Sequence, residues 1–139
     1  MPVQPKFVIF AHHATYDTLH QVATLGLTAS AMGKDVIVIL LFWTIKKLAE
    51  GKIDQVDFPP EYAASAGEVT RLLKEKNVPK ISEMFQDAKH VGKFRLIACS
   101  AGLEYMGVDS AKVEKNVDEV MGLPAIIALT SDAETKLFI

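Results

Sequence analysis

The chain has 139 residues, half of them apolar, a mean hydropathy of +0.20, and 15 basic against 17 acidic residues, for a net charge of −2. This length fits a single domain that can bury a core of its own. The near-neutral charge lacks the basic footprint of a nucleic-acid binder and a polybasic stretch for an anionic membrane, so we expect neither partner.

Cysteine content and the N-terminal sequence indicate the cellular compartment. The one cysteine, Cys99, excludes an internal disulfide and fits a reducing environment. The opening sequence MPVQPKFVIFAHH lacks the features of a signal peptide. The most apolar run, 36–43, is far shorter than the roughly 20 residues that a membrane helix needs. We therefore expect a soluble cytoplasmic protein.

The first part of the chain alternates strand and helix patterns. Residues 6–11 (KFVIFA) predict a strand, and residues 14–32 predict a helix with apolar positions every three or four residues. Thr15 can cap the start of this helix, and Gly33 can follow its end in the left-handed conformation. Residues 35–42 (DVIVILLF) are apolar on both faces, which is typical of a central strand in a parallel sheet.

An irregular segment, 51–66, interrupts this alternation. Its Pro59-Pro60 pair is incompatible with a regular helix or a central strand. Because Phe58 and Tyr62 have no obvious role in the core, we interpret the segment as an excursion that serves as a lid or an oligomer contact.

The second part of the chain returns to short elements. Helices are predicted at 67–76 and 82–91, separated at Pro79, with Ser82 as the cap of the second. The other predicted elements are helices at 44–50, 103–107, 110–113 and 123–131, and strands at 94–98, 117–120 and 136–139.

Alternating strands and helices predict the fold class. We expect a three-layer α/β/α domain over residues 1–139, with a doubly wound, five-stranded parallel sheet. A flavodoxin-like strand order would place the first strand beside the third. Sites in such sheets lie outside the carboxyl ends of the strands.

Cys99 follows the strand predicted at 94–98 and is the main candidate for chemistry. If a helix begins at Ser100 or Ala101, the sulfur faces free backbone amides and the positive end of a helix dipole, which favours the reactive thiolate. The alternative is a buried cysteine that acts as a small hydrophobic residue. The absence of a CxxC motif excludes a dithiol mechanism within the chain.

Other side chains at strand ends could line a pocket around Cys99. His12 and His13 could stabilise a thiolate or move a proton, or they could be solvated or helix-capping imidazoles. Phe42 and Trp43 could form a pocket wall or close the core.

Metal and nucleotide sites are not expected. Adjacent histidines usually point apart, and with Cys99 only three such ligands would be available. The sequence has no GxGxxG, no Walker loop and no GxSxG elbow, so we expect no cofactor and no serine-hydrolase chemistry.

Four segments carry a resemblance to a known family: AMGKDVIVILLFWTIKKL (31–48), NVPKISEMFQDAKHVG (77–92), LIACSAGLEYMGV (96–108) and the final LFI. They resemble the DsrE/DsrF-like sulfur-trafficking proteins, in particular the subgroup with an FW pair after the second strand and an AC…MG cysteine motif. This resemblance implies a DsrE-like fold, a homo-oligomer that is often a trimer or hexamer, and a cysteine, aligned with Cys99, that passes persulfide sulfur to a TusA-like or rhodanese-like partner. The chain departs from the family where Ser100-Ala101-Gly102 replaces methionines, and over 51–66.

The leading hypothesis is a sulfur carrier or sulfurtransferase-like protein with a persulfide on Cys99. Amides of Ser100, Ala101 and Gly102 would stabilise the anion, and Met106 of the motif would belong to the same pocket. The alternative is a non-catalytic, oligomeric small-molecule-binding or scaffold protein in which Cys99 only lines a pocket. A third hypothesis is a small-molecule or flavin-type binder that uses Phe42 and Trp43.

Overall fold

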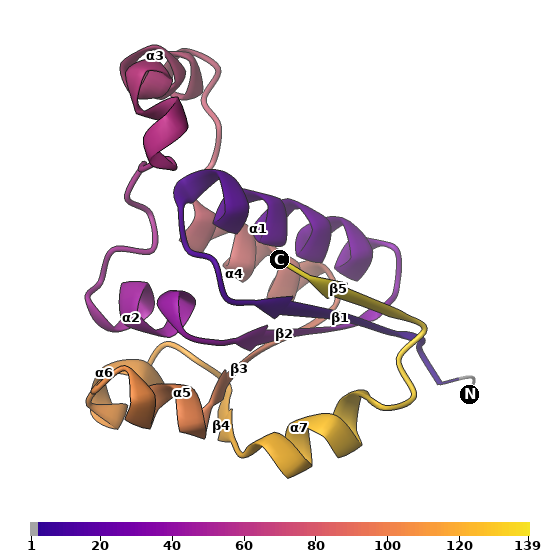
Figure 1. Cartoon of the computed structure of the whole chain (residues 1–139). Helices are drawn as coiled ribbons and strands as arrows, with labels where there is room; N and C mark the ends of the chain where they lie inside the picture. The colour runs from indigo at the N-terminus through magenta and orange to yellow at the C-terminus, as the bar shows by residue number, and fades with distance from the viewer. Residues whose placement is uncertain (1–2) are drawn as a thin grey trace.

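Residues 3–139, which the computed structural model describes, form an α/β fold around a sheet of five parallel strands (Figure 1). The strands are β1 (Lys6–Ala11), β2 (Asp35–Leu40), β3 (Lys93–Cys99), β4 (Glu119–Met121) and β5 (Thr135–Phe138). Their order across the sheet is β4-β3-β2-β1-β5, and every neighbouring pair is parallel. The predicted fold class is confirmed.

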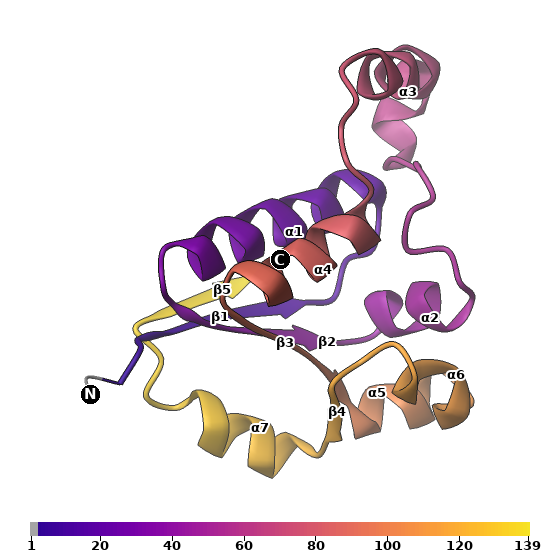
Figure 2. The same ribbon diagram turned by 180° about the vertical axis from the view of Figure 1, so that it is seen from behind.

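Helices cover both faces of the sheet and give the expected three layers. The helices are α1 (Tyr16–Ala31), α2 (Trp43–Ala49), the 3-10 helix η1 (Pro60–Ser65), α3 (Ala66–Glu75), α4 (Ile81–Val91), α5 (Ser100–Tyr105), α6 (Ser110–Glu114) and α7 (Leu123–Thr130). In both views α1 and α4 lie side by side on one face, whereas α5, α6 and α7 lie on the other side of the sheet (Figures 1 and 2).

The strand order differs from the flavodoxin-like expectation. β2 lies between β1 and β3, so β1 does not neighbour β3. The crossovers before β2 and β3 carry α1 and α4 over the same face, and right-handed crossovers on one face extend a sheet in one direction. The crossover through α7, on the other face, then places β5 beyond β1.

The core is centred on β2, where all six residues are buried. Its apolar side chains face helices on both sides, as the two-sided apolar pattern predicts. Asp35 is the charged exception. Its carboxylate lies 3.5 Å from the Lys93 ammonium and 3.6 Å from the Arg95 guanidinium, at the edge of the sheet opposite the carboxyl ends.

Two boundaries near Cys99 differ from the prediction. β2 ends at Leu40, not at residue 42, because Phe42 adopts a left-handed φ of 49° with ψ of −110° that no strand contains. α5 begins at Ser100, three residues earlier than the predicted 103–107 helix.

The predicted helix caps were wrong, although Gly33 does take the expected left-handed conformation, with φ of 82°. Thr15 is the N-cap residue of α1 but makes no capping hydrogen bond. Ser82 lies inside α4, after Ile81. Carboxylates from the excursion replace both caps.

The predicted excursion (51–66) and the helix α3 that follows it divide into two parts with different environments. Residues 51–59 pack on the body, where Phe58 meets the Tyr16 ring edge-on at 6.0 Å, so the expectation that Phe58 lacks a core role was wrong. The Tyr16 N–H donates to Asp57 Oδ1 at 2.8 Å, and the Ser82 N–H donates to Asp54 Oδ1 at 2.9 Å. Residues 60–75 stand away from the sheet and the other helices (Figures 1 and 2).

Candidate functional site

Cys99 is the last residue of β3 and the N-cap of α5, at the carboxyl edge of the sheet. Its backbone is extended, with φ of −73° and ψ of 123°, and the chain turns into the helix at Ser100. On the two sides of β3, Cys99 is paired with Met121 of β4, and Ala98 is paired with Leu40 of β2. The cysteine therefore occupies the strand-to-helix junction that the sequence predicts.

The Cys99 side chain is covered within the single chain, with only 2% of the residue exposed. Gly102 brings α5 close to the start of α2. A Cβ on Gly102 would lie 2.5 Å from Ile45 Cδ1, 3.6 Å from the Phe42 nitrogen and 3.9 Å from Cys99 Cβ. Gly102 thus lies between Cys99 and the β2–α2 turn, and Cys99 is almost entirely covered in this conformation.

Aromatic side chains are exposed around the same edge. Phe42 and Trp43 are 48% and 52% exposed, and Tyr105, at the end of α5, is also exposed. The positive φ of Phe42 is a strained conformation for a residue with a bulky side chain. The buried Thr44 fixes this turn, because its hydroxyl donates to the Ala11 carbonyl at 2.8 Å and accepts from the Leu41 N–H at 3.0 Å. Phe42 and Trp43 therefore face outward and do not close the core.

The other predicted pocket residues are dispersed. The His12 and His13 rings lie beside each other, with centroids 4.0 Å apart and planes tilted by 38°, and the His12 backbone N–H donates to the Ile139 carbonyl. Because β2 separates β1 from β3, the expectation that the strand order brings the histidines next to Cys99 was wrong. Ser100 is exposed and Ala101 half-buried, both in the first turn of α5.

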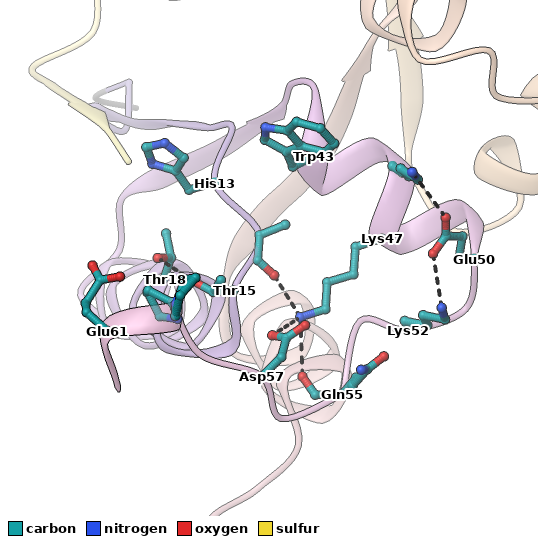
Figure 3. A pocket seen from close by; sticks show the side chains of 14 residues that line it. His13, Thr15, Thr18, Trp43, Lys47, Glu50, Lys52, Gln55, Asp57 and Glu61 are labelled. Atoms are coloured by element: carbon teal, nitrogen blue, oxygen red, sulfur yellow. Dashed lines mark hydrogen bonds and ion pairs between the residues drawn. The ribbon is translucent and has the colours of Figure 1, made fainter. Parts of the chain in front are cut away.

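A pocket of about 700 Å³ lies beside α2, between the start of α1 and the excursion (Figure 3). His13 and Trp43 line this pocket, but Cys99 does not. A smaller hollow of about 250 Å³ contains Met106, together with Lys46 and Lys112. Of the predicted pocket residues, His13 and Trp43 thus line one hollow and Met106 the other, and neither hollow includes Cys99.

Lys47 also lines the larger pocket, and it was not predicted as a site residue from the sequence (Figure 3). This lysine is 8% exposed, and its Nζ donates to the Ala14 carbonyl at 2.7 Å, to Asp57 Oδ1 at 2.8 Å and to the Gln55 carbonyl at 3.3 Å. The available signal was its position between the apolar Ile45 and Leu48 in a short helix. With three acceptors, the Lys47 ammonium joins the excursion to the body.

The described residues give two further results. Within residues 3–139, no group of three or more His, Cys, Asp or Glu side chains could hold a metal ion. No helix in that range is both long and apolar enough to cross a bilayer.

Comparison with known proteins supports the fold alone. No protein-family model matches the sequence, and the curated proteins give no significant match. The structure is similar to that of BT1422, a conserved protein of unknown function from Bacteroides thetaiotaomicron, with a TM-score of 0.59 at 19% identity over 97% of this chain and 95% of that chain. It is also similar to the ychN protein of E. coli, with a TM-score of 0.58 at 16% identity over 99% of this chain and 100% of that one.

Proposed function

We propose that this chain is a sulfur carrier of the DsrE/DsrF-like kind that holds sulfane sulfur as a persulfide on Cys99. The observation that carries the proposal is the position of the chain's one cysteine, at the β3–α5 junction on the carboxyl edge of the sheet. Ligand and catalytic residues gather at this edge in open parallel sheets. The resemblance in 96–108 supports the same assignment.

The chemistry consists of two exchange reactions without net oxidation. In the first reaction, the Cys99 thiolate attacks the outer sulfur of a donor persulfide, R–S–SH. A new S–S bond forms on Cys99, the donor S–S bond breaks, and R–S⁻ leaves. In the second reaction, an acceptor thiolate takes the outer sulfur, and the Cys99 thiolate is regenerated. One cysteine is sufficient because the donor and the acceptor supply the other thiols.

The coverage of Cys99 adds a requirement for movement. A persulfide extends the side chain by one S–S bond of about 2.05 Å. In our proposal, the turn at Phe42 moves to admit the donor, because this turn is strained and lies just across Gly102 from the cysteine. Between the two reactions, the same coverage protects the bound sulfur from other thiols.

The proposal includes partners and a compartment. We propose a homo-oligomer, a trimer or a hexamer, that acts in the cytoplasm with a TusA-like or rhodanese-like protein. The single cysteine and the near-neutral charge support this setting.

Intact-mass measurement after incubation with a persulfide donor tests the proposal. The native chain should gain the mass of one sulfur atom, and Cys99→Ser should gain none. The matched control is the double variant Cys99→Ser, Ser131→Cys, which moves the thiol to an exposed residue after α7. A lack of sulfur uptake with any donor, or equal uptake rates at both positions, would overturn the assignment.

A second candidate function is small-molecule binding in the larger pocket. It is favoured by the volume of about 700 Å³ and by the separation of this pocket from Cys99. Trp43 is the chain's one tryptophan and lines the pocket, so its fluorescence reports occupancy. Native mass spectrometry that finds a co-purified molecule, released by Trp43→Ala but retained by Cys99→Ser, would favour binding over sulfur transfer.

A further inference from the structure

The segment formed by η1 and α3, here called the arm (residues 60–75), is the part of the described chain that packs least on its own body. None of its residues is buried. Both views show the arm on the far side of α1 and α4 from α7 (Figures 1 and 2). A helical segment that is ordered but uncovered raises the question of what it packs against.

The arm has the pattern of a helix that packs on another element. Val69, Leu72 and Leu73 lie at spacings of three and four, so they share one face of α3, and the charged residues lie elsewhere on the helix. Leu73 contacts the core and Val69 is half-buried, but Leu72 remains exposed, as does Tyr62 of η1 at 61%. The apolar face is therefore only partly used within the chain.

A second uncovered apolar face lies on α7. This helix, LPAIIALT, has no charged residue, and only Ile126 and Thr130 are buried. Leu123 and Ile127, one turn apart, are 47% and 65% exposed. Because α7 and the arm lie on opposite sides of the molecule, they cannot cover each other within one chain.

The total exposed area indicates how much surface such a contact could cover. The chain exposes 7850 Å² at a mass of 15.2 kDa. A compact monomer of that mass exposes about 7100 Å². The excess of about 750 Å² is close to the roughly 800 Å² that each partner contributes to a standard interface.

We infer that the occupant of the arm is a second copy of this chain, with the arm of one copy packed on α7 of the next. This contact covers both apolar faces at once, whereas an arm-to-arm contact would leave α7 uncovered. The contact is head-to-tail, so each copy uses its arm toward one neighbour and α7 toward the other. In the trimer or hexamer of the proposed function, such contacts close into a ring. The inference rests on the homo-oligomer in the proposed function, but not on the chemistry of Cys99.

Light scattering of paired variants at micromolar concentration tests this contact. Leu72→Glu and Ile127→Glu should each convert the oligomer into monomers, because each places a charge in the contact without touching the core. Thr70→Glu, on the arm, and Ala125→Glu, an exposed position on the side of α7 opposite Leu123 and Ile127, are the controls and should leave the oligomer intact. An equimolar mixture of the two monomeric variants should form a dimer, because the arm of Ile127→Glu can still bind α7 of Leu72→Glu.

Each outcome has a distinct meaning. An oligomeric native protein that is unaffected by Leu72→Glu would overturn the arm contact, while leaving the proposed oligomer intact. A mixture that stays monomeric would overturn the head-to-tail arrangement. A monomeric native protein would overturn both the contact and the oligomer. It would not overturn sulfur uptake by Cys99, which the intact-mass measurement tests separately.

Discussion

Lys47 and Asp57 form an ion pair with 2.8 Å between Nζ and Oδ1, and the lysine side of this pair is almost entirely buried. The same carboxylate oxygen accepts a hydrogen bond from the Tyr16 N–H, at the first residue of α1. One side chain from the excursion thus compensates a buried ammonium and caps a long helix.

Removal of this carboxylate should destabilise the fold. In Asp57→Ala, the Lys47 ammonium keeps two carbonyl acceptors but loses its counter-charge. The Tyr16 N–H at the start of α1 loses its side-chain acceptor and keeps only the backbone carbonyl of residue 57, at 2.9 Å. We expect the free energy of unfolding in urea to fall by about 2 kcal/mol. The control is Glu75→Gln, which removes the exposed Arg71 pair at the end of α3 and should cost less than about 0.5 kcal/mol. A similar cost for both variants would contradict the structural role given to Asp57.

Tyr16 should make stability depend on alkaline pH. Burial, and secondly the charge of Asp54, raise the pKa of the Tyr16 phenol above its ordinary value of 10.0. The folded state therefore favours the neutral phenol. This contribution is fully present below pH 10.0, the ordinary value, and is lost as the pH rises through the higher folded pKa.

Urea unfolding at pH values on both sides of 10.0 measures this effect. Tyr16→Phe should lose less stability than the native chain on going to the higher pH. Asp54→Asn should lower the pKa of Tyr16, as followed by tyrosinate absorbance. Identical pH profiles for the native chain and Tyr16→Phe would show that the phenol does not contribute.

Gly92 should not tolerate a side chain. A Cβ at this position would lie 2.5 Å from the Ser30 carbonyl oxygen, a backbone atom that cannot move aside cheaply. Gly92→Ala should lower the free energy of unfolding by about 1–3 kcal/mol. Gly67→Ala is the matched control, because nothing lies within 4 Å of its new methyl group and the position is helical. This control should be neutral or stabilising by about 0.5 kcal/mol, since alanine favours helix over glycine.

Phe42→Gly should stabilise the chain while impairing its function. Glycine adopts the φ of 49° without the cost of a side chain, and the half-exposed ring contributes little burial. We expect a gain of about 1 kcal/mol in urea unfolding. Lys46→Gly, in the regular backbone of α2, should lose about 1 kcal/mol. Sulfur uptake by Phe42→Gly should be slower, because in the proposed function the strain at this turn favours the movement that admits the donor.

The sequence carried enough information for the elements but not for their order. The apolar pattern of 35–40 identified a central strand because both faces of that strand are buried. Whether β3 pairs with β2 or with β1 depends on which face of the sheet receives α4, and no local sequence pattern encodes this choice. The prediction that the first strand lies beside the third was wrong for that reason.

In the candidate site, too, local features could be predicted from the sequence, whereas contacts between distant segments could not. Cys99 could be placed at a strand-to-helix junction because the LIA run before it and the glycine after it are local signals. Its burial could not be predicted in the same way, because the close packing of the neighbouring Gly102 on Ile45 joins different parts of the chain. The cap from Asp57 to Tyr16 spans 41 residues and could not be predicted from spacing.

The two aspartates of the excursion have a shared consequence for partial unfolding. Asp54 accepts from both the N–H and the hydroxyl of Ser82 in α4, and Asp57 accepts from Tyr16 in α1. Detachment of residues 51–59 would therefore free the first turns of two neighbouring helices in one event. Amide hydrogens in those turns should exchange with solvent as one cooperative unit, although the two helices begin 65 positions apart in the chain.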